Sequence, residues 1–253
     1  MTNKNKIISI YDNPQLYDDI MYWKKDDIDF WYQFIKENNI KSVLELCCGT
    51  GRIGLPIINM GVNYYGIDTS FKFIEFFKSK INQYDSDKIS IGDAAKFNLN
   101  QKFDLIIIGF NSIAHLLHNS EIQACFKNVY NHMHKNSTFI IDIFMPTNEL
   151  TSNLSTIEVD LMDFRDTENG RYLKIYESNH YNPDTEVNNI IWDFKNKDHQ
   201  TEYLYQFDMR ILFPDTLHTL LADNRLIVKN FFGNYNLEPF NGNSEKQIYI
   251  CTK

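Results

Sequence analysis

The glycine-rich stretch at residues 45–54 has the composition and spacing of a ligand-binding loop. Its sequence, ELCCGTGRIG, contains the pattern G-x-G-x-x-G, whose glycines let the backbone approach a bound ligand at the start of a helix. In dinucleotide-binding domains this pattern holds a pyrophosphate, and an acidic residue about 20 positions later binds the ribose hydroxyls. Asp68, in the stretch YYGIDTS, meets that requirement. The pattern alone therefore leaves open which cofactor the loop binds.

The carboxylate of Glu45 distinguishes between two kinds of ligand. Glu45 ends an apolar strand directly ahead of the glycine loop, where its charge would repel a pyrophosphate and would suit an ammonium and a sulfonium. The stretch GDAAKF places Asp93 and the amide of Ala94 where an adenine amino group and ring nitrogen can be bound. Residues 1–41 precede the first strand, whereas dinucleotide-binding domains more often begin with that strand. Together these features favour a sulfonium cofactor.

The elements that position these residues alternate between strands and helices. Strands are predicted for the short apolar runs at 42–46, 62–67, 88–91, 103–109 and 137–144. Helices are predicted for the segments at 15–38, 52–60, 70–83 and 119–134. This alternation predicts an α/β fold with a doubly wound, Rossmann-like parallel sheet.

The pattern changes in the second half of the chain. Residues 156–212 alternate polar and apolar side chains, with turn residues at 182–184 and 196–198, which predicts three or four antiparallel strands. Pro214 then opens a helix, and two closing strands return to the main sheet. We therefore expect an N-terminal helical lid (1–38) and a cofactor-binding α/β domain (39–155 and 213–253). The inserted antiparallel β subdomain (156–212) either walls the acceptor pocket or forms a homodimer contact.

Composition narrows the class of partner. The 253 residues carry a formal net charge of −8 and no long basic run, which argues against nucleic acid as a partner. No apolar run approaches the ~20 residues of a membrane span, and the N-terminus lacks the apolar core of a signal peptide. None of the four cysteines is spaced as a metal or redox motif. We therefore expect a cytoplasmic protein with reduced thiols, no bound metal and a small-molecule partner.

The motifs together resemble those of the class I S-adenosylmethionine-dependent methyltransferases. VLELCCGTG is similar to the first motif of that family, GID to the second and GDA to the third, and FDLIIIGFNSIAHL resembles the fourth strand and the loop that faces the reacting methyl. The N-terminal IYDNPQLYDDIMYWK, the late antiparallel strands and the C-terminal segment resemble a bacterial branch that includes sugar-amine N-methyltransferases. One departure is Cys47, where many members have glycine. The resemblance implies S-adenosylmethionine as cofactor and S-adenosylhomocysteine as product.

The resemblance also implies a role for each matching residue around the methionine portion of the cofactor. Gly49 and Gly51 pass close to it, and Glu45 helps hold its amino group. The main-chain carbonyl of Phe110, after the fourth strand, also binds that amine. Glu45 acting only through a hydrogen-bond network and Phe110 serving only as a core residue are the alternatives.

Further residues are expected to bind the nucleoside and the carboxylate ends of the cofactor. Asp68 accepts hydrogen bonds from the ribose hydroxyls, and Asp93 and Ala94 bind the adenine. The alternative for Asp93 is a cap of the following turn. The methionine carboxylate is expected to be held by Arg52, which could instead be a surface residue, and by an N-terminal tyrosine. That tyrosine is either Tyr11 or Tyr17.

Methyl transfer from a sulfonium is an in-line displacement that needs alignment and a dry pocket, and a base when the acceptor must lose a proton. The loop FNSIAHLLH offers Asn111 and His115 near the expected reaction centre, and histidine titrates near neutrality. The alternative for His115 is a purely structural histidine.

We predict methyl transfer to a small molecule, most favourably an amine. The alternatives are an NAD(P)-dependent oxidoreductase, a non-catalytic S-adenosylmethionine-binding module, and a peptide N-terminus as acceptor.

Overall fold

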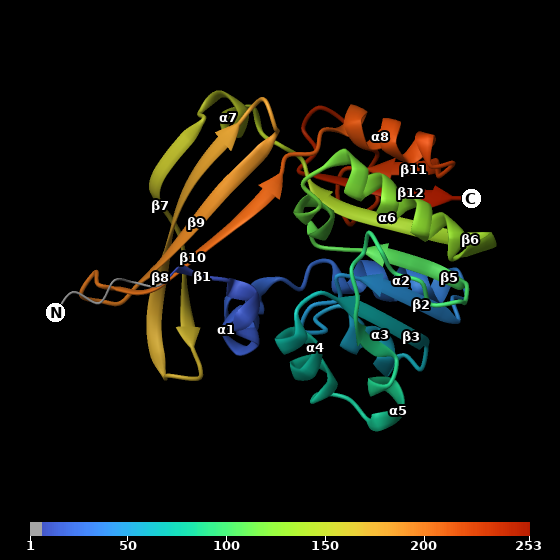
Figure 1. The fold of residues 1–253 in the computed structure, drawn as a ribbon, viewed down its shortest axis with the longest axis horizontal. Helices are drawn as coiled ribbons and strands as arrows, with labels where there is room; N and C mark the ends of the chain where they lie inside the picture. The colour runs from blue at the N-terminus through green and yellow to red at the C-terminus, as the bar shows by residue number, and fades with distance from the viewer. Residues whose placement is uncertain (1–6) are drawn as a thin grey trace. The chain divides into compact units, whose positions relative to one another are not determined.

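The computed structural model describes residues 7–253, which fall into two units. The antiparallel unit contains the described residues up to Lys24 and residues 146–211, and the α/β unit contains residues 25–145 and 212–253. The chain therefore changes unit at residues 24–25, 145–146 and 211–212 (Figure 1). Helix α2 (Ile28–Glu37) belongs to the α/β unit, and the lid function predicted for residues 1–38 stays a prediction.

A seven-stranded sheet in the order β11-β12-β6-β5-β2-β3-β4 forms the centre of the α/β unit. Its strands are β2 (Ser42–Leu46), β3 (Asn63–Asp68), β4 (Ile89–Ile91), β5 (Phe103–Ile108), β6 (Met133–Phe144), β11 (Ile227–Phe232) and β12 (Lys246–Thr252). Strands β4, β3, β2, β5 and β6 run parallel, whereas β12 is antiparallel to both β6 and β11. The predicted doubly wound α/β fold is confirmed.

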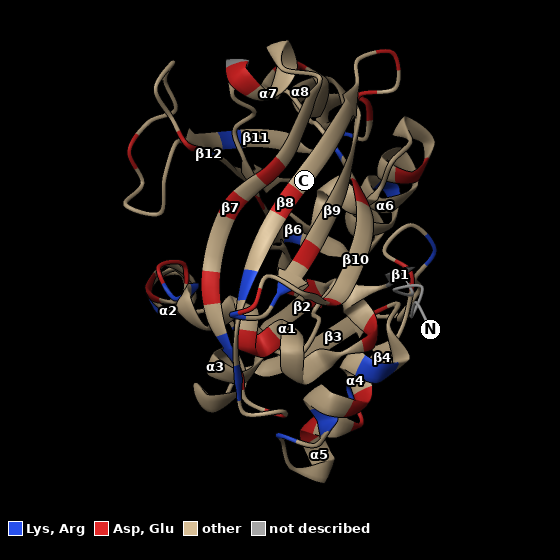
Figure 2. Ribbon diagram, turned by 90° about the vertical axis from the view of Figure 1, so that its left-hand side faces the viewer, with Lys and Arg blue, Asp and Glu red and all other residues tan. Residues whose placement is uncertain are grey.

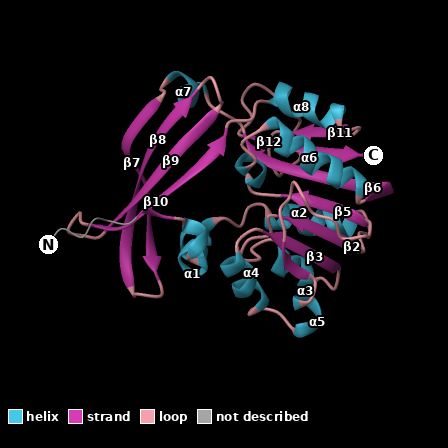
Figure 3. Ribbon diagram, viewed as in Figure 1, coloured by secondary structure: helices cyan, strands magenta, loops and turns pink. Residues whose placement is uncertain are grey.

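Helices accompany the strands of this sheet (Figure 3). Besides α2 they are α3 (Gly54–Asn59), α4 (Phe71–Lys78), α5 (Gln83–Ser86), the 3₁₀ helix η3 (Ser112–His115), α6 (Asn119–Asn131) and α8 (Pro214–Asp223). The side chain of Ser70 caps α4 by accepting from the Phe73 amide at 3.2 Å, and α4 buries Phe73, Ile74 and Phe77.

Two predicted boundaries in the α/β unit were wrong. The helix expected at 119–134 ends at Asn131, and the strand expected from 137 begins at Met133. Met133 pairs with Phe103 on β5, so tertiary strand pairing extends β6 past the point where the apolar run begins. The helix expected at 70–83 is likewise interrupted, because α4 ends at Lys78 and Asn82 caps a separate α5.

The core of the α/β unit lies on both faces of its parallel strands. β5 contributes Leu105, Ile106 and Ile107, all fully buried, as expected for a strand covered on both sides. Trp31 from α2 packs in the same cluster as Leu105 and Ile107. The continuous apolar run that predicted this strand is therefore explained by the burial of both faces of β5.

The antiparallel unit is built on a five-stranded sheet in the order β1-β10-β9-β8-β7. Its strands are β1 (Ile7–Ile8), β7 (Ser155–Asp166), β8 (Arg171–Asn182), β9 (Val187–Lys195) and β10 (Thr201–Arg210). The turns predicted around Asn182 and Asn196 are present, and each asparagine side chain accepts hydrogen bonds from backbone amides of its own turn. Strand β1, which pairs parallel to β10, was not predicted because two residues carry no periodic pattern.

Short helices complete the antiparallel unit. They are η1 (Ile10–Asp12), α1 (Pro14–Ile20), η2 (Met21–Trp23) and α7 (Asn148–Ser152). Leu16 and Ile20 of α1 are buried in one cluster with Phe194 and Tyr205 of the sheet. The carboxylate of Asp19 accepts from the amide of Thr167 at 2.7 Å, which ties α1 to the β7–β8 turn.

Charged residues follow the long strands of the antiparallel unit (Figure 2). Lys174 on β8 pairs with Asp160 on β7, and Lys195 on β9 pairs with Glu158 on β7, both at 2.8 Å. These cross-strand pairs are exposed on their acidic side, so solvent weakens them. Within residues 7–253 no helix combines the length and the apolar character that a membrane crossing requires.

The two ends of the segment 146–211 leave the α/β unit beside a single buried side chain. The Nε2 atom of Gln247 donates to the carbonyl of Phe144 at 3.1 Å and to the carbonyl of Leu212 at 2.8 Å. Gln247 is fully buried, and its Oε1 accepts from the hydroxyl of Tyr249 at 2.8 Å. This side chain therefore uses both of its polar ends to hold the exit and re-entry points of the chain.

Candidate functional site

The glycine loop follows β2 with a backbone that few residue types adopt easily. Gly49 has φ +55° and Gly51 has φ +87°, both in the left-handed region. A Cβ atom on Gly51 would lie 2.3 Å from the ring of Phe77, so only glycine lets the loop pack on α4. Cys47, with φ +60°, shares this conformation without being a glycine. The departure noted at Cys47 therefore falls at a position whose backbone favours glycine.

Asp68 and the glycine loop lie together, as the sequence predicted. At the end of β3, Asp68 accepts from the Gly49 amide at 2.9 Å and, through its other carboxylate oxygen, from the Ser70 amide at 2.8 Å. Burial raises the pKa of Asp68, and these hydrogen bonds oppose that shift. Each carboxylate oxygen has a second lone pair, so Asp68 can still accept from two adjacent hydroxyls.

Glu45 is a buried acid at the end of β2, only 3% exposed. Its Oε2 atom accepts from the hydroxyl of Tyr64 at 2.6 Å. Burial, which this hydrogen bond opposes, raises the pKa of Glu45 to about 8. A cation bound beside the carboxylate would favour its charged form and lower that pKa. The acid is thus placed where an ammonium would be stabilised.

Arg52, on the first turn after the glycine loop, pairs with a fully buried aspartate. Its two terminal nitrogens each lie 2.7 Å from a carboxylate oxygen of Asp27, which is 0% exposed. The guanidinium also lies over the ring of Phe110, 4.7 Å from its centroid. Asp27 was missed because nothing in the sequence links it to Arg52. The predicted contact between Arg52 and a methionine carboxylate stays a prediction.

The loop after β4 shows the capping role that the sequence allowed for Asp93. One carboxylate oxygen of Asp93 accepts from the Ala95 amide at 2.8 Å, which caps the turn, and the other accepts from Lys96 at 2.8 Å. The hydrogen bond from Lys96 lowers the pKa of Asp93, so the acid is charged at neutral pH. Ala94 is buried beside it. Their contact with adenine stays a prediction.

The turn after β5 has two consecutive non-glycine residues in the left-handed region, Phe110 at φ +49° and Asn111 at φ +63°. The side-chain oxygen of Asn111 accepts from the Phe144 amide at 2.7 Å, so this side chain holds the backbone at the end of β6. His115 ends η3 and is exposed. The catalytic roles predicted for Asn111 and His115 stay predictions.

Tyr11 and Tyr17 belong to the antiparallel unit. Both are partly buried against its core, with ring centroids 6.2 Å apart. The amphipathic packing that competes with a cofactor role is therefore present. Which of the two tyrosines contacts a cofactor stays a prediction.

The loops after β2, β3, β4 and β5 share one edge of the α/β sheet. All four strands are parallel, so their carboxyl ends meet there. From β2 the chain moves outward to β3 and β4 and then returns to β5 on the other side of β2, which makes the β2–β5 pair a topological switch point. Ligands of open α/β sheets bind at this place. Among the described residues, no cluster of histidine, cysteine and acidic side chains is arranged to hold a metal ion.

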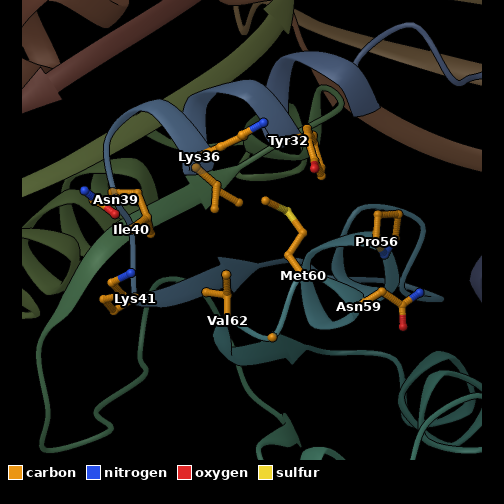
Figure 4. A pocket seen from close by; sticks show the side chains of 11 residues that line it. Tyr32, Lys36, Asn39, Ile40, Lys41, Pro56, Asn59, Met60 and Val62 are labelled. Carbon is orange, nitrogen blue, oxygen red and sulfur yellow. The ribbon is translucent and has the colours of Figure 1, made fainter.

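A pocket of about 520 Å³ lies at the opposite edge of this sheet (Figure 4). Its wall comes from the C-terminal ends of α2 and α3 and from the residues just before β2 and β3, including Tyr32, Lys36, Lys41, Met60 and Val62. None of the predicted site residues lines it. The amino ends of parallel strands seldom carry the chemistry of such folds, so this pocket is separate from the candidate site.

Comparison with known proteins was made for the sequence and for the fold. Residues 43–136 match the family described as "Methyltransferase domain". No curated protein sequence matches the chain.

Solved structures match over nearly the whole length. The CcbJ methyltransferase from Streptomyces caelestis has a TM-score of 0.80 at 18% identity, covering 96% of this chain and 98% of that one. An S-adenosylmethionine-dependent methyltransferase from Clostridium acetobutylicum has a TM-score of 0.73 at 21% identity, with 94% and 96% covered. The sugar N-methyltransferase KedS8 from Streptoalloteichus has a TM-score of 0.70 at 14% identity, with 100% and 97% covered. At these identities the likeness establishes the fold.

Proposed function

We propose, from the match of residues 43–136 to a methyltransferase domain family, that this chain methylates an amine of a small molecule with S-adenosylmethionine as the donor. The observation that carries the proposal is the edge where Asp68 meets the glycine loop, with Glu45 buried beside it. Asp68 keeps lone pairs for ribose hydroxyls, and Glu45 suits an ammonium. A pyrophosphate would meet two acids there, which disfavours a dinucleotide.

When bound, S-adenosylmethionine supplies a methyl group on a positively charged sulfur. The residues of this chain contribute binding and alignment: Asp68 orients the ribose, and Glu45 neutralises the amino group of the methionine portion. Gly49 and Gly51 give the ligand close access to the loop backbone. His115 accepts the proton that an ammonium acceptor must lose before it can react. Asn111 fixes the backbone of the turn that precedes His115.

Two further observations support a polar amine as the acceptor. Among the solved structures of this fold, KedS8 is a sugar N-methyltransferase and CalS10 from Micromonospora echinaspora is an amino pentose methyltransferase. In the antiparallel unit, the buried polar atoms without a hydrogen-bond partner include Thr156 Oγ1, Asn179 Oδ1 and Asn188 Oδ1. Such atoms need partners, and hydroxyl groups of an acceptor would supply them. We therefore propose that this sheet contributes to acceptor recognition.

Calorimetric titration tests the cofactor. The protein is expected to bind S-adenosylmethionine and S-adenosylhomocysteine and not NAD or NADP. Tight binding of NAD would overturn the proposal in favour of an oxidoreductase. Binding without turnover across a panel of amines, amino sugars and peptides would favour a non-catalytic binding module.

Replacing Asp68 tests the geometry of the site. Asp68→Ala removes the acceptor of two ribose hydroxyls and should weaken S-adenosylmethionine binding by roughly 1.5–3 kcal/mol, or about 10- to 100-fold. The matched control is Asp104→Ala, because Asp104 also accepts from two backbone amides, Lys41 and Ser42, each at 2.9 Å, but at the amino ends of the strands. Asp104→Ala should leave the affinity unchanged. Wild-type affinity in folded Asp68→Ala would remove the ribose assignment.

A further inference from the structure

A fully buried aspartate on β6 holds the strained turn of the candidate site. The Oδ2 atom of Asp142 accepts from the amide of Phe110 at 3.0 Å, and the main-chain carbonyl of Asp142 accepts from the amide of Asn111 at 3.0 Å. Both amides belong to the two consecutive left-handed residues. A left-handed phenylalanine is uncommon and persists only where its surroundings enforce it. Asp142 is the group that enforces it here.

Asp142 is in turn held by the segment between β11 and β12. The hydroxyl of Tyr235 donates to the same Oδ2 atom at 2.5 Å. Burial and the charge of Asp142 both raise the pKa of Tyr235, so its hydroxyl keeps the proton that it donates. Lys246 lies 3.7 Å from Oδ1, an atom with no hydrogen bond, and over the Tyr235 ring at 4.9 Å. Asp142 is thus contacted by a cation and by two donors, the Phe110 amide and the Tyr235 hydroxyl.

The far side of this arrangement reaches α2. The ring of Tyr235 packs on that of Phe30 at 5.7 Å between centroids. On the other side of the turn, the ring of Phe110 lies under the guanidinium of Arg52, which Asp27 fixes. The turn therefore lies between two buried acids: Asp142 accepts from the amides of Phe110 and Asn111, and Asp27 holds Arg52 over the Phe110 ring.

We infer that Asp142 and Tyr235 are positioning residues that set the backbone of Phe110 and Asn111 for cofactor binding. The inference rests on the proposed function, because it assigns this turn to the S-adenosylmethionine edge of the sheet. Neither residue needs to contact the cofactor. Both act through the direction in which the Phe110 and Asn111 peptide groups point.

The sharpest variant is Tyr235→Phe, which removes one hydroxyl and leaves the ring on Phe30. Its matched control is Tyr249→Phe, because Tyr249 is a fully buried tyrosine on β12 of the same sheet and also donates a side-chain hydrogen bond, to Gln247 at 2.8 Å. Hydrogen exchange of the Phe110 and Asn111 amides is measured without any cofactor. Tyr235→Phe should speed this exchange about tenfold or more. Tyr249→Phe should leave it unchanged while lowering the melting temperature by a similar amount.

Calorimetry with S-adenosylmethionine as the probe gives a second readout. Tyr235→Phe should raise the Kd about three- to tenfold, and Asp142→Leu, where it folds, should raise it more. Asp142→Asn keeps an acceptor oxygen for the Phe110 amide and should restore most of the affinity that Asp142→Leu loses. Tyr249→Phe should stay within about twofold of the wild type.

The outcomes separate the inference from the proposed function. Equal exchange rates and equal affinities in Tyr235→Phe and Tyr249→Phe would overturn the inference and leave the cofactor assignment standing. A wild-type protein that binds no S-adenosylmethionine would overturn the proposed function, while faster exchange in Tyr235→Phe would still show that Tyr235 fixes the turn.

Discussion

The two units of this chain treat their acidic residues differently. In the α/β unit Asp27, Glu45 and Asp142 are buried, and each is held by a group from a remote segment: Arg52, Tyr64 and Tyr235. In the antiparallel unit the long strands carry acids such as Glu158 and Asp160, which pair across strands on an exposed face. Removing one partner of a buried pair leaves a buried charge uncompensated, whereas an exposed partner returns to water. Substitutions should therefore be far more costly in the α/β unit.

Neutralising an arginine in each unit gives the largest expected contrast. Arg52→Met leaves Asp27 without its cation in a fully buried site and should lower the free energy of unfolding by about 3–5 kcal/mol. Arg171→Met in the antiparallel unit removes a cation that is 36% exposed and that also pairs with Glu202. Its second partner, Asp166, is buried but keeps hydrogen bonds from Asn169 and Tyr203. About 1 kcal/mol is expected there. Urea unfolding of both variants measures the difference, and equal losses would refute the contrast.

The buried acid Glu45 should make stability depend on pH. Its pKa is about 8 in the folded chain, against about 4.5 for the free side chain. The folded state therefore keeps a proton that the unfolded state releases between these values. The stabilisation is fully present below pH 4.5 and is lost as the pH rises through 8. At about 1.4 kcal/mol per pKa unit, roughly 3 kcal/mol should disappear between pH 5.5 and 8.

The variant Glu45→Gln isolates this effect, because glutamine keeps an acceptor for Tyr64 and does not titrate. Thermal unfolding of the wild type and of Glu45→Gln, followed across that pH range, measures the difference in stability. As the pH rises, the wild type should lose stability relative to Glu45→Gln. A gap that stays constant would mean that Glu45 is already charged at pH 5.5.

Backbone strain gives the smallest contrast. Cys47→Gly should stabilise the α/β unit by about 1 kcal/mol, because glycine adopts φ +60° without the cost that a Cβ atom adds. His199, at φ +58° in the β9–β10 turn, is exposed and is a residue type better tolerated in that region. His199→Gly should gain less than half as much. Melting temperatures of the two variants and the wild type decide the order.

The fold and the contact between the glycine loop and Asp68 were predictable because their signals are local. Strand periodicity, the glycine loop and an acid at the end of the next strand depend on residues close together in sequence. The predicted resemblance to class I methyltransferases is confirmed by the family match at residues 43–136 and by the shared fold. The structure brings Gly49 and Asp68 into direct contact, as their spacing required.

The buried partners were not predictable because their signals are not local. Asp27 and Arg52 are 25 residues apart, and Asp142 and Tyr235 are 93 apart. An acid in the stretch KDDID or IIDIF looks the same whether it is exposed or buried. Only the folded chain reveals which acid meets a remote partner. The two-residue strand β1 was missed for a related reason, because its pairing with β10 is what identifies it as a strand.

The hydrogen bonds of Gln247 bear on how this chain could change during evolution. Because one amide group holds both Phe144 and Leu212, residues 146–211 start and finish at the same small area of the α/β unit. Insertions whose ends lie close together are tolerated by a host domain, since its own sheet need not rearrange. The segment can therefore be exchanged as a cassette between related genes, together with the N-terminal strand that pairs with it. A lineage could in this way acquire a new acceptor in one recombination event while inheriting its cofactor edge unchanged.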